Sequence, residues 1–227
     1  MKIRIRQVYY DWFQQGSLLK GSEPYYYPLA DPFLENRVLR DCVRCGDHLG
    51  SDYYGVLSWR FSQKTGKKGV DVQSAIERDA DRPDVYSFFG NAPDANVWLR
   101  AVLVCHPLRL AEIAQKIFNR LGRTEDIFEL KTPVIYSNYW IARPFVLERY
   151  VSEMLVPAMS LMEEDDEIRT LCFEDARYRP VHHRALSPRK CKKIFGRPYY
   201  TYHPFICERL FPSWLALHPE VRFKNFS

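Results

Sequence analysis

Glu208 and Arg209 stand side by side in the segment 199–214, YYTYHPFICERLFPSW, which is otherwise aromatic and apolar. Such neighbours predict that the pair is partly buried. A buried carboxylate is costly unless it is paired, so it is either a structural anchor or a working group. One interpretation is therefore an ion pair that stabilises a helix. The other is a carboxylate and a guanidinium that act on a bound molecule.

A second group of carboxylates comes before a short apolar segment. Asp79-Ala80-Asp81 is a D-x-D tripeptide, and Asp84 begins the segment DVYSFF, 84–89. Paired carboxylates supply the hard oxygen ligands that suit Mg²⁺ or Mn²⁺ beside a diphosphate. Such ligands in α/β sheets belong beyond the carboxyl ends of strands, whereas this tripeptide precedes its strand. A solvated turn is therefore the favoured interpretation of Asp79 and Asp81.

Three further features could contact a ligand. His106 directly precedes Pro107 at a predicted helix start, where an imidazole serves as a base, a ligand contact or a structural cap. Asn138 interrupts the segment VIYSNYWIA, 134–142, and a buried amide there needs main-chain or ligand partners. The segment 187–198, SPRKCKKIFGRP, is the one basic cluster. Interpreted as a loop, it could stabilise a leaving diphosphate, approach an anionic bilayer or simply be solvated.

The bulk composition narrows the function class. The chain has 227 residues, which suits a single domain, 1–227, with one sizeable core. Its net charge of +5, without a long basic tract, argues against nucleic-acid binding and suits an anionic small ligand or an acidic membrane surface. No run of about 18 apolar residues and no signal-peptide core occur. We therefore expect a cytoplasmic protein, with contact to the inner face of the membrane through 187–198 as an option.

The familiar short motifs are missing. The sequence contains no P-loop, no G-x-G-x-x-G, no G-x-S-x-G and no H-E-x-x-H. Cys42 and Cys45 form a C-x-x-C followed by His48, but no second ligand pair follows at zinc-finger spacing. Reduced structural cysteines are therefore favoured over a metal site.

The elements that must position these residues alternate between strands and helices. Strands are predicted at 3–10, 53–61, 84–89 and 134–142, and a long loop at 16–32. Helices are predicted at 32–44, 71–79, 96–104, 107–121, 144–162 with a kink at Pro157, and 205–217. This alternation predicts a single α/β domain with a mainly parallel, mixed sheet flanked by helices.

The order of four segments resembles the bacterial capsular-polysaccharide and exopolysaccharide glycosyltransferase-like family. YYGVLSWRF, 53–61, stands where that family has an early strand of the type YxGLxHYRR. VWLRAVLVCHPLRL, 97–110, is similar to its segment ending in a His before a helix. SNYWIARPFVLERYVSEML, 137–155, is similar to its Asn-containing strand and long helix, and HPFICERLFPSWL, 203–215, to its GxxxERLxxxxL helix.

The resemblance implies a GT-A-like nucleotide-diphospho-sugar transferase domain that acts in polysaccharide biosynthesis. Its partners would be a nucleotide-sugar donor and a glycan acceptor, with Mg²⁺ or Mn²⁺ as an optional ion. A carboxylate, Asp84 or Glu208, would take the acceptor proton or steady the oxocarbenium-like transition state. Six residues would bind the substrates: Tyr54, Trp59, Arg60, His106, Asn138 and Arg209.

The chain departs from the family pattern at three places. Ser58 replaces the His of the early motif, Arg60 is a single arginine instead of a pair, and no glycine precedes the ERL sequence. The alternative function is therefore a non-catalytic glycan- or nucleotide-binding protein of the same fold. A third possibility is a structural partner in an assembly whose aromatic surface binds protein.

Overall fold

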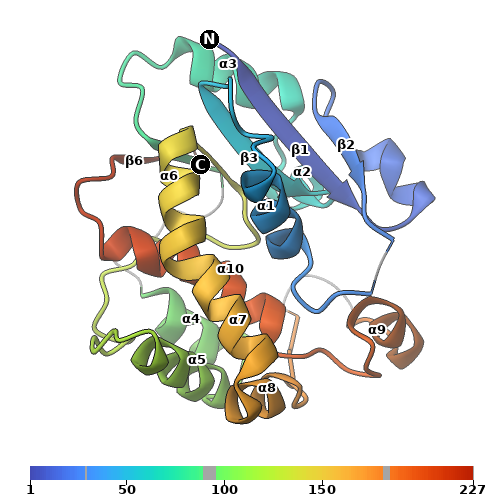
Figure 1. The fold of residues 1–227 in the computed structure, drawn as a ribbon. Helices are drawn as coiled ribbons and strands as arrows, with labels where there is room; N and C mark the ends of the chain where they lie inside the picture. The colour runs from blue at the N-terminus through green and yellow to red at the C-terminus, as the bar shows by residue number, and fades with distance from the viewer. Residues whose placement is uncertain (29, 89–95, 181–184, 227) are drawn as a thin grey trace.

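A mixed sheet of six strands forms the centre of the computed structural model, which describes residues 1–28, 30–88, 96–180 and 185–226 (Figure 1). The strand order is β2-β1-β3-β5-β4-β6. The strands are β1 (Ile3–Tyr9), β2 (Glu23–Tyr26), β3 (Tyr53–Ser58), β4 (Val85–Ser87), β5 (Trp140–Ala142) and β6 (Phe223–Asn225).

Helices connect and cover the strands. The short ones are the 3-10 helix η1 (Trp12–Ser17), α2 (Phe61–Thr65), α8 (Asp166–Cys172) and α9 (Pro188–Phe195). The others are α1 (Glu35–Arg44), α3 (Gly69–Arg78), α4 (Val97–Val104), α5 (Arg109–Arg120) and α10 (His203–Ala216). A continuous helical rod consists of α6 (Pro144–Tyr150), the π-helical turn η2 (Val151–Leu155) and α7 (Val156–Glu164).

Parallel pairing predominates in the sheet. β1 is parallel to both β2 and β3, and β4 is parallel to β6. β5 lies between β3 and β4 and is antiparallel to both. The predicted α/β domain with a mainly parallel, mixed sheet is therefore confirmed. Because β5 is reversed, β1, β3 and β4 all point their carboxyl ends to the same edge of the sheet.

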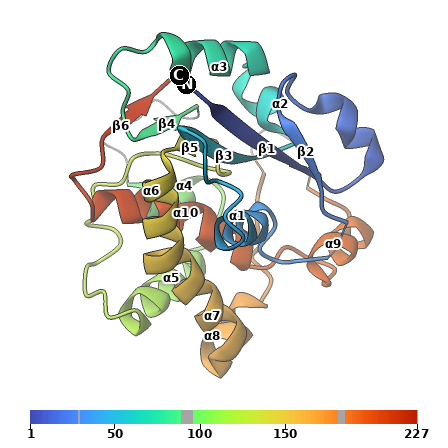
Figure 2. The ribbon, with the colours of Figure 1, turned by 45° about the horizontal axis from the view of Figure 1, so that its top comes forward.

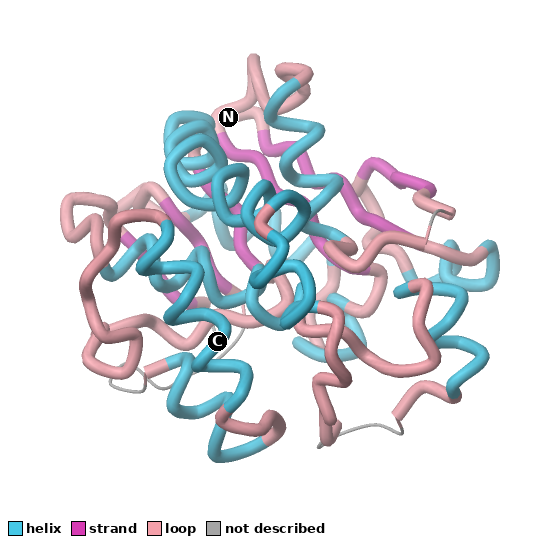
Figure 3. The backbone as a smooth tube through the Cα atoms, turned by 60° about the horizontal axis from the view of Figure 1, so that its bottom comes forward, coloured by secondary structure: helices cyan, strands magenta, loops and turns pink. Residues whose placement is uncertain are grey.

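The two faces of the sheet carry two separate cores. Tyr54 and Val56 of β3 pack into the larger core with α1, α4, α5, α10 and the α6–α7 rod, whereas Tyr53 and Leu57 pack into a smaller core with α2 and α3. Figure 2 shows α3 above the sheet and α1, α6 and α10 below it, and Figure 3 shows the helices of the larger core in front of the strands. This alternation follows from the two-residue period of a strand.

Several predicted boundaries were wrong for identifiable reasons. Residues 187–198, predicted as a loop, contain the helix α9, which begins with a Ser187 cap and Pro188 and ends at Gly196 in a left-handed conformation. Residues 16–32 contain β2 and the end of η1. The strand predicted at 134–142 is reduced to β5, because residues 137 and 138 form a turn with positive φ. The end of segment 84–89 lies outside the described residues.

The predicted kink at Pro157 takes the form of the π-helical turn η2, which ends two residues before the proline. Proline lacks the N–H that would continue the α-helical ladder, so a local change in hydrogen bonding there is expected. Among the described residues, no helix is both long enough and apolar enough to cross a bilayer.

Candidate functional site

Residues from three parts of the chain meet at the carboxyl edge of β1 and β3. Tyr10 follows β1, Trp59 and Arg60 follow β3, and the turn 137–139 precedes the antiparallel β5. The chain leaves β1 for β2 on one side and returns to β3 on the other. Ligands of α/β proteins bind at such a reversal of strand order, outside the carboxyl ends of the strands.

Helix α10 brings Glu208 to this edge. The backbone amide of Ser137 donates a hydrogen bond to the Glu208 carboxylate. Burial raises the pKa of Glu208 above its usual value, the charges of Arg209 and Lys64 oppose that rise, and the charge of Glu35 adds to it. The side chain of Glu208 keeps 22% of its surface exposed, so it is accessible to a bound molecule. A carboxyl group in this state is a candidate general base.

Lys64 acts on the charge of Glu208, and Arg60 acts on the neighbouring Tyr139. Lys64 of α2 lies with its Nζ 3.1 Å from Ser137 Oγ and 5.6 Å from the centre of the Tyr139 ring. Burial raises the pKa of Tyr139, and the charges of Glu35, Glu208 and Arg60 all act on its hydroxyl. We call the residues Glu35, Arg60, Lys64, Tyr139 and Glu208 the edge cluster.

The backbone around the edge cluster adopts uncommon conformations. Ser137 has φ 57°, Asn138 has φ 53° and Leu34, just before α1, has φ 53°. Each such non-glycine residue costs roughly 1–2 kcal/mol, and backbone strain of this kind concentrates at functional sites. The Nδ2 of Asn138 donates to Asn36 Oδ1 at 3.0 Å, while Asn138 Oδ1 is buried and accepts no hydrogen bond from the part of the chain that the structure describes.

His106 and Arg209 form a second, more buried group next to the edge cluster. The His106 ring packs against Tyr178 at 5.0 Å and Phe205 at 4.3 Å between ring centres, and neither ring nitrogen has a hydrogen-bond partner among the described residues. Burial lowers the pKa of His106 to about 2, and the charge of Arg209 adds to this shift. The imidazole is therefore neutral, which makes it a hydrogen-bonding group and not a cation.

Arg209 is held mainly by its own helix. Its Nη1 donates to the Phe205 carbonyl oxygen at 2.5 Å, and its guanidinium lies 5.3 Å from the centre of the Tyr136 ring. The distance between Arg209 Nη1 and Glu208 Oε2 is 3.9 Å, which is at the limit of an ion pair. Partial burial of the Glu208–Arg209 pair is confirmed, but the pair is too loose to be a strong anchor.

Two predicted substrate-binding residues, one in β3 and one just after it, are placed differently. Trp59 is half-buried at the carboxyl edge, and the Arg60 guanidinium lies 5.0 Å from the centre of its ring. Tyr54 lies at the amino end of β3 and is fully buried, with its hydroxyl donating to Asp47 Oδ2 at 2.7 Å. Tyr54 therefore belongs to the core and is corrected from a ligand contact to a structural residue.

Asp84 lies at the opposite edge of the sheet from Glu208, because it precedes the amino end of β4. Its Oδ2 accepts from the Arg222 backbone amide at 2.9 Å, and its Oδ1 lies 3.3 Å from Arg143 Nε. These contacts tie β4 to the start of β6 and the end of β5. The geometry gives Asp84 a structural role and does not bring it together with Glu208 as a second catalytic carboxylate.

The D-x-D carboxylates bind a lysine. Lys224 Nζ lies 2.6 Å from Asp79 Oδ1 and 2.8 Å from Asp81 Oδ2. The interpretation as a solvated turn holds for Asp81, but the Asp79 side chain is only 8% exposed. In the C-x-x-C segment, His48 Nε2 lies 2.9 Å from Glu148 Oε1, and Cys42 and Cys45 are free thiols.

No group of three or more His, Cys, Asp or Glu side chains able to hold a metal occurs within residues 1–28, 30–88, 96–180 and 185–226. The edge cluster offers two carboxylates, Glu35 and Glu208, and has the ammonium group of Lys64 beside them. These residues do not fit a divalent-ion site, so we assign no step to Mg²⁺ or Mn²⁺.

Sequence reasoning missed Glu35 and Lys64. Lys64 lies four residues after Arg60, on the first helical turn beyond the SWRF segment, so its position at the same strand end could have been inferred. Glu35 follows a residue with an uncommon backbone conformation, which no local sequence pattern marks.

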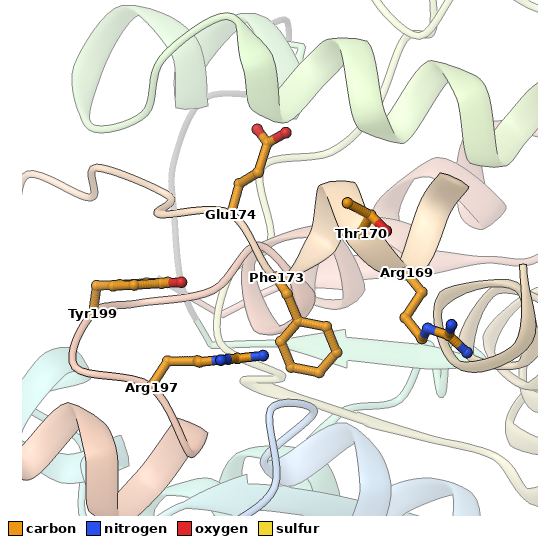
Figure 4. A pocket seen from close by; sticks show the side chains of 6 residues that line it. All are labelled: Arg169, Thr170, Phe173, Glu174, Arg197 and Tyr199. Carbon is orange, nitrogen blue, oxygen red and sulfur yellow. The ribbon is translucent and has the colours of Figure 1, made fainter. Parts of the chain in front are cut away.

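Two open cavities lie apart from the edge cluster. One, of about 470 Å³, lies between α8 and the segment after α9 (Figure 4), and its lining residues are Arg169, Thr170, Phe173, Glu174, Arg197 and Tyr199. Its charged groups are largely occupied, since Arg169 pairs with Asp166 and Glu174 pairs with Arg109. The other, of similar size, shares Glu174 and is lined by Arg109, Asp175, Arg177 and Tyr202.

Comparison with known proteins identified no relative of this chain. The sequence matches no protein-family model, and no curated protein or solved structure is recognisably similar to it. The resemblance to the glycosyltransferase-like family therefore depends on its four short segments, and the functional argument depends on the geometry of the edge cluster.

Proposed function

We propose that this protein is a glycosyltransferase of GT-A-like fold that transfers a sugar from a nucleotide-diphosphate donor to a hydroxyl of a surface-polysaccharide acceptor. One observation carries the proposal. At the carboxyl edge of parallel strands, the partly exposed carboxyl of Glu208 has a raised pKa and lies among Lys64, Arg60 and Tyr139. A base and cations in one place suit a reaction that removes a proton and releases a diphosphate.

The transfer step uses these groups as follows. Glu208 accepts the proton of the acceptor hydroxyl, and the hydroxyl oxygen forms a bond to the anomeric carbon of the donor sugar. The bond from that carbon to the diphosphate oxygen breaks, and the diphosphate leaves with the electron pair. Lys64 and Arg60 stabilise the negative charge that develops on the leaving group. Because its pKa is raised, Glu208 is a stronger base near neutral pH than an ordinary glutamate.

Binding of the donor would use the aromatic and amide groups at the same edge. The face of Trp59 next to Arg60 suits stacking with a base or sugar ring. The unpaired Oδ1 of Asn138 is an acceptor for a sugar hydroxyl, since a buried polar atom without a partner requires a reason. His106 and Arg209 support this region from the more buried side.

The second candidate function is a glycan- or nucleotide-binding protein of the same fold without catalysis. The observation that favours it is Ser58, which replaces the family's His and whose Oγ accepts from the Arg60 backbone amide at 3.3 Å. A serine engaged with its own backbone contributes no acid or base. Turnover separates the two functions.

The test combines binding with turnover. Thermal shift is measured with UDP-, GDP-, CMP- and dTDP-sugars, with and without Mn²⁺, because a donor at 100 times its Kd stabilises by about 2.7 kcal/mol. Hydrolysis of each donor that binds is then measured for the wild type, Glu208→Gln and Asp84→Asn. These are matched carboxyl-to-amide changes at the two edges of the sheet.

We expect Glu208→Gln to retain donor binding and to lower turnover by about 10²-fold or more. Asp84→Asn should keep turnover within about twofold, because that carboxylate lies at the opposite edge. Turnover of Glu208→Gln at the wild-type rate would show that Glu208 is not the general base. A shift without turnover would support the binding protein, and the absence of any shift or hydrolysis would overturn both proposals.

A further inference from the structure

One corner of the molecule combines exposed aromatic side chains with a basic helix. Helix η1 follows β1, and α9, which is far from it in the sequence, lies on the same side of the molecule (Figures 1 and 2). An ion pair joins them, since Lys193 Nζ lies 3.6 Å from Asp11 Oδ2. We call η1 together with α9 the docking corner.

The aromatic part of the docking corner is exposed. Trp12 is 61% exposed and Phe13 is 88% exposed, which is the largest value among the large hydrophobic side chains of the described residues. One face of Trp12 stacks on Tyr26 with 4.6 Å between ring centres, so the indole is held in place while its outer edge faces solvent. Tryptophan and phenylalanine in such positions suit the interface between lipid headgroups and acyl chains.

The basic part is amphipathic. Helix α9 buries Cys191 and Phe195 against the protein. Its outward surface, together with Arg197 two residues after its end, presents five exposed cations, which are Arg189, Lys190, Lys192, Lys193 and Arg197. Within the described part of the chain, the only salt bridge of these five is that of Lys193 to Asp11, and the charge of Asp175 acts on Cys191 of α9. Cations without acidic partners are available to an anionic surface.

The docking corner is continuous with the edge cluster. Tyr10, Asp11 and Trp12 are consecutive residues. Burial and the charge of Glu35 raise the pKa of the Tyr10 hydroxyl, so Tyr10 faces the edge cluster two residues before Trp12 reaches the surface. A surface that binds the docking corner is thereby brought next to the candidate site.

We propose that the docking corner binds the surface of a membrane that contains anionic lipids, with Trp12 and Phe13 entering the interface and α9 lying on the headgroups. A projecting aromatic pair flanked by cations suits a flat anionic surface, and neither of the two cavities is lined by Trp12, Phe13 or the cations of α9 itself. The inference deepens the proposed function and depends on it in one respect. A glycan acceptor anchored in lipid would be presented to Glu208 from this side.

The experiment measures sedimentation of the full chain with vesicles of pure phosphatidylcholine and with vesicles that contain about a third phosphatidylglycerol. We expect binding to the anionic vesicles only, and a decrease in that binding as salt is raised. Phe13→Ser and the double variant K190E/K192E should each lower the affinity about tenfold or more. Phe13 is preferred to Trp12 because its ring contacts no other ring among the described residues, whereas Trp12 stacks on Tyr26.

Matched controls lie on other faces of the molecule. Leu103→Ser replaces a side chain on α4 that is 74% exposed, and R78E/K131E makes the same change in net charge at α3 and before β5. Both should bind within about twofold of the wild type. Equal losses in the controls, binding to neutral vesicles as strong as to anionic ones, or no binding at all would overturn the proposal.

Vesicle binding is independent of turnover, so the two proposals fail separately. Glu208→Gln should bind anionic vesicles like the wild type while losing sugar transfer. If the wild type transfers sugar to a soluble acceptor but does not bind anionic vesicles, the docking corner has no membrane role and the proposed function stands. If it binds vesicles and hydrolyses no donor, the docking corner stands and the proposed reaction falls.

Discussion

The side-chain amides of Asn36 and Asn138 are joined by a buried hydrogen bond of 3.0 Å from Asn138 Nδ2 to Asn36 Oδ1, across 102 positions of the sequence. This bond ties the start of α1 to the turn before β5. Glu35 stands next to one partner and Ser137 next to the other. The positions of the Glu35 carboxylate and of the amide that binds Glu208 therefore depend on the same contact.

Two replacements of Asn138 should separate the contributions of its hydrogen bond and of its backbone conformation to the free energy of unfolding. Asn138→Ala removes the donor to Asn36 and places a Cβ without a compensating side chain at φ 53°. We expect a loss of about 1–3 kcal/mol in the free energy of unfolding from the buried amide. Asn138→Gly loses the same hydrogen bond without the left-handed strain, which is about 1 kcal/mol. Urea unfolding should rank the wild type above Gly and Gly above Ala, and equal values for Gly and Ala would contradict the strain.

The carboxyl of Glu208 should cost stability at neutral pH. Its pKa in the folded protein is raised above the usual 4.5, so the stabilising contribution of the protonated form is complete below about pH 4.5 and is lost as the pH rises through the raised pKa. Glu208→Gln removes this loss. We expect a higher Tm than the wild type at pH 7.5, by a few degrees since about 1 kcal/mol corresponds to about 2–4 °C in a domain of this size.

The two Tm curves should converge near pH 4, where the wild-type carboxyl is protonated. Glu129→Gln, an exposed glutamate before β5, is the control and should follow the wild type at every pH. A destabilised Glu208→Gln at neutral pH would show that the carboxylate is held by favourable partners, which would contradict the raised pKa.

His106 should make the protein sensitive to mild acid. Burial lowers its pKa from 6.5 to about 2 in the folded state, so the unfolded chain binds one more proton between these values. The stability that the neutral ring contributes is present above about pH 6.5 and is lost as the pH falls, by up to about 1.4 kcal/mol per pH unit. The free energy of unfolding of His106→Gln should fall less steeply from pH 6.5 to 4.5. A proton NMR titration should show the His106 ring still neutral at pH 4.5.

Much of the fold could be predicted because the strands and long helices have regular hydrophobic periods. The helix at 107–121 is typical, since its apolar residues lie on one face and Gly122 follows its end. The helix α9 was missed although Ser187, Pro188 and Gly196 mark its ends. Its basic composition favoured a solvated loop. In the structure, two buried residues, Cys191 and Phe195, are enough to pack one face of a helix against the protein.

The candidate site was predictable only in part. Glu208, Arg209 and Asn138 stood out because polar residues in apolar segments need partners, and all three lie at or beside the carboxyl edge. Tyr54 and Asp84 were drawn from the correct strands but from the amino ends. The direction of β4 depends on the reversed β5, and no local pattern reveals that pairing.

An ion-pair network on the larger-core side explains why Tyr54 is structural. Asp47 Oδ2 lies 2.7 Å from Arg6 Nε and accepts from the Tyr54 hydroxyl at 2.7 Å, and Asp47 Oδ1 lies 3.1 Å from Arg4 Nη2. The hydrogen bond and charge of Arg6 hold the pKa of Asp47 well below its usual 3.8. Asp47 therefore stabilises the fold above about pH 3.8, and that contribution is lost as the pH falls through the lowered pKa.

Asp47→Asn should lower the free energy of unfolding by about 2–3 kcal/mol at pH 7, because two largely buried guanidinium groups lose their shared anion. Glu23 contacts the same arginines but its side chain is 40% exposed, so Glu23→Gln should cost about 0–1 kcal/mol. Urea unfolding at pH 7 and pH 3 should show the gap between Asp47→Asn and the wild type shrinking in acid. Equal costs for the two variants at pH 7 would contradict the prediction that burial strengthens the Asp47 pairs.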